Sequence, residues 1–441
     1  MASKSELLDA QNFSRRRLLT AFVSGAPGGK ELEPAKPLRG VIAGIVLSLA
    51  VLLVGWFLSF NVKALPEDWG TGKLIIDTTT GSRYVTADDT LHPVLNIASA
   101  RLLLSADASA KPIEASGTLL VGKPVGTTVG IPGAPDTMPT PDQLVNTAWT
   151  ACIADDTGGV ATSIDRSPIA EAAAAGTAIV ARAEKTQWVV VGGTRFQLPK
   201  NDVDGLLRDI GLGSAPRVEV STSWLNLFSL GSPLTPTSVR DAGRSLVGSD
   251  LRVGDVVRTT ITDSDARYLV MSDGSLAELT PFGLALYQHG PTYSPDRNYD
   301  VDAPQVASLP TSAEPAQPED WPVAALAPAA GTPCALAQTN GQVAQTVLAT
   351  ADANAELTAG TKVEPSMGAL VSVAGADEGS ASLLMLIDPT ATQYAIPGAD
   401  DELLAQLGYT PADIGHATPE WMALFDSGPA LTRAAAGATS G

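Results

Sequence analysis

The uncharged run at positions 41–60, VIAGIVLSLAVLLVGWFLSF, is the feature that most constrains this chain of 441 residues. A helix rises 1.5 Å per residue, so a helix of this length spans about 30 Å, the thickness of the hydrocarbon core of a bilayer. The run therefore predicts a single transmembrane helix that divides the chain between two compartments.

The charges on either side of the run predict its orientation. The first forty residues hold seven basic and four acidic residues, whereas the whole chain has a net charge of −19. Basic flanks stay in the cytoplasm, and long domains cross the membrane whatever their acidic charge. We therefore expect a cytoplasmic N-terminus and an acidic extracytoplasmic domain. Nucleic-acid binding is excluded, because it needs a basic surface that this composition lacks.

A cleaved signal peptide is the competing interpretation, since residues 14–19, SRRRLL, resemble a twin-arginine export motif. A signal's apolar stretch is short and follows its basic region closely. Here the stretch is longer, and residues 25–39 separate it from the arginines. The spacing favours a retained membrane helix.

The N-terminal segment predicts an amphipathic helix. Ser3 and Glu6 have the spacing of a capping box, and apolar residues follow at helical intervals as far as Gly25. Such a helix can lie on the membrane surface or pack on a partner protein. The expected docking residues are Arg15, Arg16, Arg17, Leu18, Leu19 and Phe22. For the arginines alone, a role in setting topology fits equally well.

Two cysteines, Cys152 and Cys334, fall on the predicted outer side of the membrane. Oxidising conditions there allow disulfides to persist, and an even count favours pairing, so we expect them to bond to each other. Two independent buried thiols are the alternative. A metal site is disfavoured, because no His or second Cys stands beside either residue.

The outer part contains an internal repeat. Residues 206–235 match residues 403–432 at ten positions, without a gap, after a shift of 197. Each copy predicts a short helix that ends at glycine and then a second helix with an apolar face. The predicted packing residues are Trp224, Leu227, Phe228, Trp421, Leu424 and Phe425. The alternative for the two tryptophans is a surface pair that stacks on sugars.

Hairpin patterns precede each copy, at residues 188–199 and 383–397, and weaker ones occur at residues 73–86 and 268–281. The chain is therefore expected to be an α+β, single-pass membrane protein with an elongated ectodomain of four hairpin-plus-helix units around a central β domain. The expected segments are 1–40 (cytosolic helix and linker), 41–60 (span), 61–116 (first unit), 117–187 (central), 188–250 (second unit), 251–300 (central strand and third unit), 301–333 (Pro-rich linker), 334–382 (central), 383–433 (fourth unit) and 434–441 (disordered tail).

No catalytic constellation is visible, so we expect no catalytic, cofactor-binding or metal-binding residues. A phosphate-binding loop needs Gly-Lys followed by Ser or Thr. The three Gly-Lys pairs are followed instead by Glu31, Leu74 and Pro124. Residues 383–388, LLMLID, superficially resemble a strand that presents a magnesium-binding Asp, but a buried strand ending at Asp388 is the simpler interpretation. The histidines, at positions 92, 289 and 416, stand in unrelated surroundings.

Several longer motifs carry a family resemblance. They are residues 11–29, QNFSRRRLLTAFVSGAPGG, residues 91–104, LHPVLNIASARLLL, residues 130–139, GIPGAPDTMP, and residues 149–152, WTAC. With these motifs the chain resembles, over essentially its whole length, the EccB family of actinobacterial type VII (ESX) secretion systems.

The resemblance implies a non-catalytic structural component of a secretion complex in the cytoplasmic membrane. Its implied partners are the ATPase EccC, the multi-span subunit EccD and a nearby mycosin protease, together with further copies of itself. The family's repeats are similar to a phage-lysin cell-wall-binding fold, which makes a peptidoglycan-binding anchor the second hypothesis. Family members are also labelled as ATPases, a third hypothesis that the missing phosphate loop disfavours.

Overall fold

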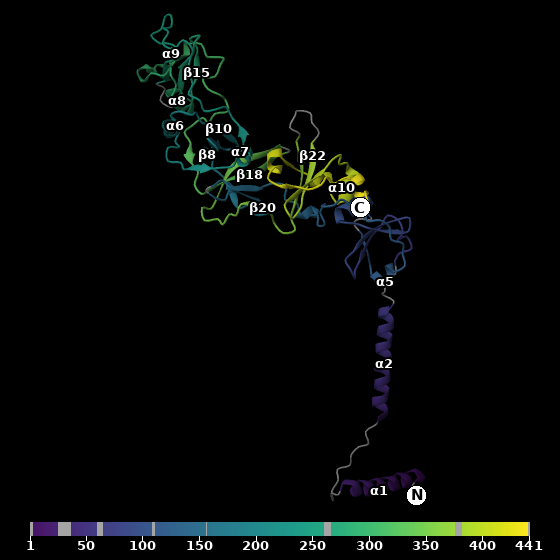
Figure 1. Cartoon of the computed structure of the whole chain (residues 1–441). Coiled ribbons are helices and arrows are strands. Elements are labelled where there is room, and N and C mark those ends of the chain that lie inside the picture. The colour runs from purple at the N-terminus through teal and green to yellow at the C-terminus, as the bar shows by residue number, and fades with distance from the viewer. Residues whose placement is uncertain are drawn as a thin grey trace. The chain divides into compact units, whose positions relative to one another are not determined.

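The computed structural model describes residues 3–24, 37–59, 65–107, 111–155, 157–259, 266–341, 343–374 and 382–439. It divides into two compact units, Met1–Ala64 and Leu65–Gly441 (Figure 1). Each unit is treated by itself below.

In the first unit the structure describes two helices, α1 (Lys4–Ser24) and α2 (Pro37–Ser59). One half of the predicted capping box is present at the start of α1, where the backbone N–H of Ser3 donates to Glu6 Oε2 over 2.8 Å, while the Ser3 hydroxyl accepts from the N–H of Ser5 over 3.3 Å. Among the described residues, no helix combines the length and the hydropathy that a membrane crossing requires. The end of the predicted span, Phe60, lies outside the described residues.

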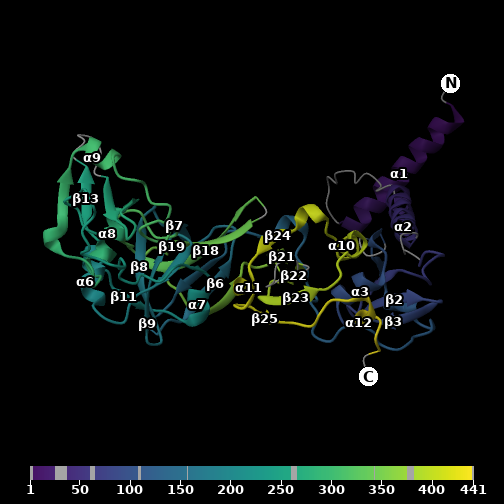
Figure 2. The same cartoon turned by 90° about the horizontal axis from the view of Figure 1, so that it is seen from above.

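The described residues of the second unit form five β-sheets, and four of these share one core topology. In each of the four, three consecutive strands form an antiparallel meander, a helix follows, and a later strand pairs in parallel with the first strand of the meander. We call these the first to fourth sheets, in chain order. Figures 1 and 2 show the first and third sheets at opposite ends of this unit.

The first and third sheets have four strands each. The elements of the first are β1 (Leu74–Asp77), β2 (Arg83–Ala87), β3 (Thr90–Pro93), α3 (Ile97–Leu103), β4 (Ile113–Ala115) and α5 (Gly117–Leu120). Those of the third are β13 (Val256–Thr259), β14 (Arg267–Val270), β15 (Leu276–Glu278), α8 (Pro281–Gln288) and β16 (Asn298–Val301), followed by α9 (Ala303–Ala307).

The second and fourth sheets add a further short parallel strand beside the third strand of the meander. The elements of the second are β8 (Thr177–Ala183), β9 (Thr186–Val191), β10 (Thr194–Gln197), α6 (Val203–Asp209), β11 (Arg217–Glu219), α7 (Thr222–Asn226) and β12 (Ser229–Leu230), and β17 (Ala327–Pro328) joins at β8. Those of the fourth are β21 (Ala369–Val373), β22 (Leu383–Ile387), β23 (Thr392–Ile396), α10 (Asp401–Leu407), β24 (Gly415–Ala417), α11 (Pro419–Met422) and β25 (Asp426–Ser427).

The fifth sheet, which we call the central sheet, is assembled from two distant stretches of sequence in the order β20-β6-β5-β18-β19-β7. Its strands are β5 (Thr150–Ile153), β6 (Val160–Ile164), β7 (Ala170–Ala172), β18 (Thr332–Asn340), β19 (Val343–Ala351) and β20 (Gly360–Val363). Its apolar face shares one core with the second and fourth sheets.

All four predicted hairpins are present, as β1–β2, β9–β10, β14–β15 and β22–β23. Their turns follow the local sequence. Gly274, which follows Asp273 in the turn between β14 and β15, has a φ of +86°, which glycine adopts without the steric cost of a side chain. Gly211 and Gly408, the predicted helix stops, follow α6 and α10 with φ of +91° and +90°.

Three features of the structure differ from the expected organisation. The strand expected in the central domain near Val256 is β13, and it pairs with β14 and β16 in the third sheet. The meanders of the second and fourth sheets begin with β8 and β21, before the expected starts at residues 188 and 383.

The third difference is the tail, which was expected to be disordered after Arg433. It begins instead with the helix α12 (Arg433–Ala436), capped by Thr432, whose hydroxyl accepts from the N–H of Ala435. Ala436 is fully buried, because α12 packs against α3 of the first sheet. Figure 2 shows α12 beside the first sheet.

The proline-rich segment 301–333 is mostly irregular, as expected, apart from α9, β17 and the first residues of β18. It is not merely a surface connection, because Trp321 within it is buried against Phe282 of the third sheet, with their ring centroids 6.2 Å apart.

Candidate assembly site

A disulfide joins the two halves of the central sheet. Cys152 on β5 and Cys334 on β18 stand directly opposite each other, with Cα atoms 3.9 Å apart, and both are fully buried. The expected pairing is therefore present. Because the bond closes a loop over a sequence separation of 182 residues, the chain-entropy model gives a stabilisation of about 5 kcal/mol at most.

Trp224 anchors the second sheet to the central sheet. It lies on α7 at 0% exposure, and its indole Nε1–H donates to the carbonyl oxygen of Ala151 on β5 over 2.7 Å. The hydroxyl of Ser221 caps α7 by accepting from the Trp224 N–H. Leu227 and Phe228 are buried in the same core, and the Phe228 ring lies 5.0 Å from that of Trp224.

Trp421 has the corresponding position on α11 of the fourth sheet. It is 1% exposed, and its Nε1–H donates to the hydroxyl of Thr346 on β19 over 2.9 Å. Trp149, which precedes β5, packs edge-on against both Trp421 and Phe425, at centroid distances of 6.1 and 5.8 Å. Leu424 is partly buried against this core. The repeated tryptophans therefore bind different strands of the central sheet, β5 and β19, and neither presents a face to solvent for stacking on a sugar.

The repeated glycines also have a structural reason. A Cβ atom on Gly231 would lie 2.4 Å from the ring of Phe196, and one on Gly428 would lie 2.3 Å from the ring of Tyr394. Phe196 and Tyr394 lie on the third strands of their meanders, β10 and β23. Each glycine thus allows the short final strand of its sheet to close over an aromatic ring.

The carboxylate of Asp388, whose position resembled that of a magnesium ligand, accepts hydrogen bonds from its own turn. Asp388 is 4% exposed, and its Oδ1 accepts from the N–H and the hydroxyl of Thr390 and from the N–H of Thr392. Its Oδ2 accepts from the Tyr394 hydroxyl over 3.3 Å. Within the described ranges there is no group of three His, Cys, Asp or Glu side chains that would hold a metal ion.

Two further hairpins contain the same kind of turn. Asp77, between β1 and β2, accepts from the Thr80 hydroxyl and the Thr79 N–H, and these bonds lower the pKa of its carboxyl group. Asp273, between β14 and β15, accepts from the hydroxyl and the N–H of Ser275, which likewise lowers its pKa. These three aspartates stabilise hairpins.

The three histidines occupy different surroundings. His92 Nδ1 lies 3.2 Å from the carbonyl oxygen of Thr127, and His416 lies on β24 beside a small cavity next to Trp149. His289 lies between two carboxylates, those of Asp202 and Asp209. No local sequence pattern signals this contact, because 80 or more residues separate the histidine from either aspartate.

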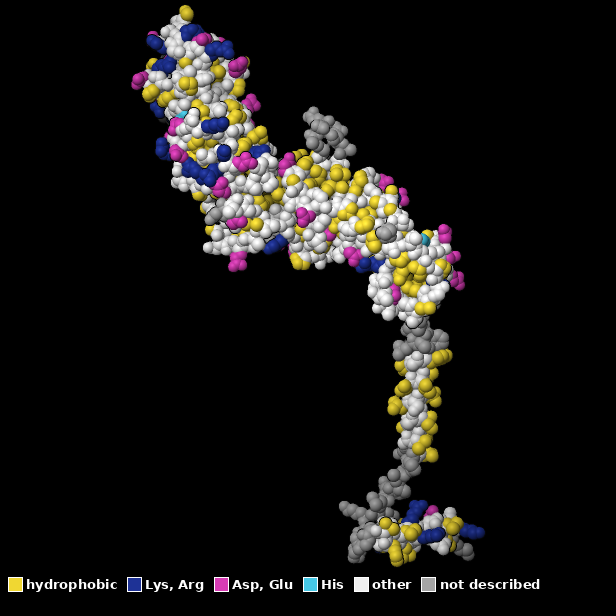
Figure 3. All heavy atoms as spheres, viewed as in Figure 1, with side chains coloured by type: hydrophobic (Ala, Val, Ile, Leu, Met, Phe, Trp, Pro, Cys, Tyr) yellow, Lys and Arg dark blue, Asp and Glu magenta, His cyan; other side chains and the backbone are white. Residues whose placement is uncertain are grey.

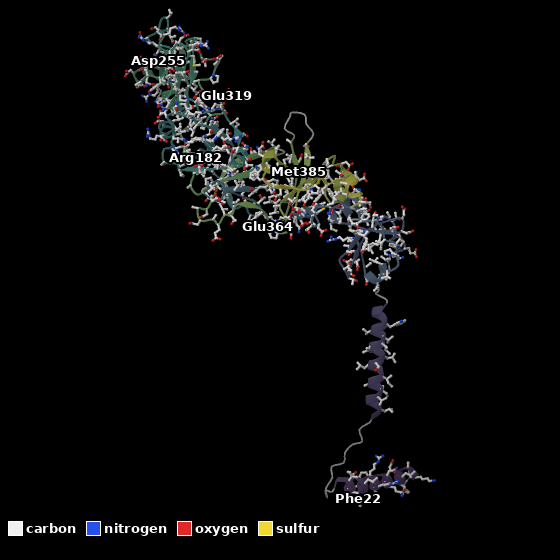
Figure 4. The ribbon with its side chains drawn as sticks, viewed as in Figure 1. Phe22, Arg182, Asp255, Glu319, Glu364 and Met385 are labelled. Atoms are coloured by element: carbon white, nitrogen blue, oxygen red, sulfur yellow. A yellow bond between two sulfur atoms is a disulfide. The ribbon has the colours of Figure 1, made fainter. Side chains whose placement is uncertain are left out.

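A groove of about 340 Å³ lies along β6 and β20 of the central sheet. Its lining combines aliphatic residues with charged ones, among them Lys362 and Glu364. Figure 4 labels Glu364. No aromatic residue contributes to the described lining, so the groove has no stacking platform for a sugar ring.

The predicted docking residues lie on α1 in the first unit. Leu18, Leu19 and Phe22 are 69%, 59% and 91% exposed. Arginines and apolar side chains share the surface of this helix in Figure 3, and Figure 4 labels Phe22 near its C-terminal end. Whether Arg15, Arg16 and Arg17 dock on a partner or only set topology stays a prediction.

Comparisons with known proteins identify the family and the relatives that this chain resembles. The family model described as "Type VII secretion system ESX-1, transport TM domain B" (EccB) matches residues 2–440. The "ESX-3 secretion system ATPase EccB3" of Mycobacterium tuberculosis strain H37Rv is 28% identical over 302 residues, covering 63% of this chain and 55% of that protein. The chain thus spans about half the length of that relative. EccB3 of Mycolicibacterium smegmatis is 29% identical over 446 residues, with 90% and 82% covered.

Two solved structures share the fold. A chain from the intact ESX-5 inner membrane complex aligns with a TM-score of 0.68 at 20% identity, covering 100% of this chain and 96% of that one. A chain from the structure of the EccB3 dimer of the ESX-3 core complex aligns with a TM-score of 0.69 at 23% identity, covering 83% and 100%.

Proposed function

Because the chain belongs to the EccB family of type VII secretion systems, we propose that it is a non-catalytic structural component of an ESX inner-membrane complex. The observation that carries this proposal is the family match over residues 2–440. The α+β fold of the second unit, with an interior built from packed tryptophans and a disulfide, supports a scaffold role.

The proposed topology is a single pass with the N-terminus in the cytoplasm. Support comes from the uncharged run at residues 41–60 and the basic segment before it. The helix α2, at 23 residues, would extend about 35 Å at 1.5 Å per residue. A reporter fused before residue 37 should be protected in intact cells and one fused after residue 439 accessible. The opposite pattern would refute this topology.

We further propose that α1 lies on the cytoplasmic side of the membrane and docks there on the EccC-type ATPase and the EccD-type subunit. A mycosin protease would be a further neighbour of the complex. The support is the exposure of Leu18, Leu19 and Phe22 on a helix that also carries three arginines. Unpartnered apolar side chains on a surface helix are typical of a binding face. Self-association of the ectodomain within the complex belongs to the same proposal.

Deletion of residues 1–38 tests the docking role, with complex isolated from membranes and its subunits quantified. Loss of the ATPase and multi-span subunits from the purified complex is expected. A double and a triple variant separate docking through the apolar residues from a role of the arginines. Leu18→Ser with Phe22→Ser removes apolar contact but keeps all charges, whereas Arg15→Gln, Arg16→Gln and Arg17→Gln keeps the apolar residues. If full co-purification survives the deletion, docking through α1 is wrong.

The four similar sheets, we propose, are copies of one repeat unit, which begins with β8 in the second sheet and with β21 in the fourth, before the expected starts at residues 188 and 383. The support is the shared order of meander, helix and returning parallel strand. The matched positions of Trp224 and Trp421, and of Gly231 and Gly428, support it for the second and fourth copies.

An ATPase function, which the names of the relatives include, finds no support in these residues. The sequence contains no phosphate-binding loop, and Asp388 Oδ1 accepts hydrogen bonds from the N–H groups of Thr390 and Thr392 in its own turn. Absence of magnesium-dependent ATP turnover by the purified chain is the expected result. Turnover that Asp388→Asn abolishes would overturn the non-catalytic proposal.

Peptidoglycan anchoring is the second candidate, and what favours it is the resemblance of the family's repeats to a wall-binding fold. The burial of Trp224 and Trp421 removes the most obvious stacking residues. Retention of the purified ectodomain on isolated sacculi decides between anchor and scaffold, and we expect no retention.

A further inference from the structure

A histidine bridges the second and third sheets through two carboxylates. His289 is the C-cap residue of α8, and its Nδ1 lies 2.8 Å from Asp202 Oδ2. Its Nε2 lies 2.7 Å from Asp209 Oδ2. The two aspartates stand at opposite ends of α6. The His289 side chain is 14% exposed, so the ring is largely enclosed, while both carboxylates remain in contact with water.

The helix that carries the aspartates is shaped to accept this ring. Gly205 lies inside α6, where glycine weakens a helix. A Cβ atom at this position would lie 3.1 Å from His289 Cε1 and 2.7 Å from Asp202 Oδ1. The missing side chain therefore leaves the space that the imidazole and its partner occupy.

Hydrogen-bond stoichiometry fixes what the bridge requires. A neutral imidazole has one N–H donor and one acceptor nitrogen, whereas an ionised carboxylate only accepts. Both short contacts can be hydrogen bonds to ionised aspartates only when both ring nitrogens carry protons. The carbonyl end of α8 also favours a positive charge at this position. A metal ion does not fit, because the carboxylates approach opposite nitrogens and share no common point with the ring.

We propose that His289, Asp202 and Asp209 form a proton-dependent bridge that couples the second sheet to the third. Loss of one ring proton places a nitrogen lone pair against a carboxylate oxygen and breaks that contact. Histidine is the side chain whose charge ordinarily changes between roughly pH 5 and 8. The external pH thus sets how firmly α8 is held on α6.

Other charged groups on the surrounding elements do not replace the two aspartates. On α6, Asp204 forms an ion pair with Arg217, and Arg208 packs against the backbone at Gly213. On α8 the titratable residue is Tyr287, whose hydroxyl donates to the carbonyl oxygen of Gly254 over 2.7 Å.

The segments on either side of α8 carry further charged residues. Glu278 lies on β15 before the helix, and Asp296 and Arg297 follow it. Arg297 donates to the carbonyl oxygens of Thr292 and Val253. Within the described part of the chain, the polar contacts of the His289 ring are those with Asp202 and Asp209.

The first test reads the protons directly, on the full chain in detergent with ¹⁵N-labelled histidine. The chain has only three histidines, so His92→Gln and His416→Gln assign the remaining signal. At pH 6 the two ring nitrogens of His289 are expected to show the equivalent shifts of an imidazolium. Asp209→Asn, whose amide can also donate, should move the change to a neutral ring to lower pH.

The second test reads the coupling, as hydrogen exchange of the α8 amides in wild type and His289→Gln at the same pH. Wild type should be protected about tenfold more at pH 6, the ratio for one charge-assisted hydrogen bond, and equally at pH 8.5. Gly205→Ala, which displaces the ring without altering charge, should abolish the difference at pH 6. His416→Gln, on the fourth sheet, is the matched control and should not change α8.

Two results would overturn the proposal. One is a neutral ring at pH 6, with one protonated and one bare nitrogen, in the wild-type chain. The other is equal α8 protection at pH 6 in wild type and His289→Gln. If His289→Gln does not fold, Asp209→Asn takes its place in the exchange measurement, with the same two readings deciding the outcome.

Discussion

Replacement of Trp224 by alanine is the sharpest test of how the second sheet is held. The side chain is 0% exposed, lies in the core shared with the central sheet, and donates to the Ala151 carbonyl over 2.7 Å. Truncation of a fully buried tryptophan costs about 3–5 kcal/mol, from lost burial and the cavity left behind. Loss of the indole hydrogen bond contributes about 1 kcal/mol within that range.

Urea unfolding of residues 65–441, oxidised, measures this cost from the shift of the midpoint at constant slope. Leu230→Ala is the matched control, since Leu230 lies six residues further along the same repeat and is 67% exposed. The control should change the free energy of unfolding by no more than about 0.5 kcal/mol.

Trp224→Phe divides the effect into its parts. Phenylalanine keeps most of the apolar volume but has no N–H group, so a cost between those of the control and of alanine is expected. A loss of unfolding free energy below about 1 kcal/mol for Trp224→Ala would refute the argument, because truncation of a fully buried tryptophan ordinarily costs several times more. It would mean that the second sheet is held to the central sheet by other contacts.

Three further predictions concern other parts of the same unit. Replacing both Cys152 and Cys334 by serine should lower the free energy of unfolding by about 2–5 kcal/mol, measured by urea titration without reductant. Gly428→Ala should lower the free energy of unfolding by about 1–3 kcal/mol in the same measurement, because the added Cβ would meet the Tyr394 ring. Gly398→Ser has open space at its Cβ, so it tests only the backbone cost of a positive φ. Burial raises the pKa of Asp255, so the protonated carboxyl favours folding, and this contribution is lost as pH rises through the pKa of the folded state. The stability of Asp255→Asn relative to wild type should therefore increase between pH 4 and 8, measured as the difference in thermal midpoints.

Burial of Asp255 explains why that variant is informative. The carboxyl is fully buried on the third sheet, where Figure 4 labels it, and its Oδ2 accepts from the Arg252 N–H over 2.7 Å. Its Oδ1 has no hydrogen-bond partner, and Arg297 Nε stands 3.9 Å away. A stability difference that stays constant with pH would show that this carboxyl does not change its protonation in the range tested.

The sequence predicted those elements whose signals are local. Hairpins alternate apolar residues around Gly or Asp turns, and the helices after them end at glycines, so both could be read directly. The first strands β8 and β21 were missed, because their residues are buried almost throughout and show no alternation. Buried strands of this kind lack the period of two on which strand recognition depends.

Contacts between distant segments could not be predicted from local patterns. The tail helix α12 is three alanines and an arginine, which give no sign of burial until α3 is placed beside it. Arg101 of α3 donates to the carbonyl oxygen of Leu407 over 2.6 Å, a contact between residues 306 positions apart. The His289 bridge is of the same kind.

The three turn aspartates bear on whether this chain carries any catalytic site. Asp388 follows an apolar strand, as a magnesium ligand would, and taken alone it invites that interpretation. Asp273 stands at the same point of the third sheet, between the second and third strands of its meander, whereas Asp77 ends the first strand of the first sheet. Both accept from a hydroxyl and an N–H in the same way as Asp388. A catalytic carboxylate needs free acceptor positions and is built once, whereas a turn residue recurs with the repeat. The second sheet, with Gly192 and Gly193 at this turn, reaches the same hairpin without an aspartate. The aspartate is therefore one of two local solutions for the turn, which is what a structural role predicts and a catalytic role does not.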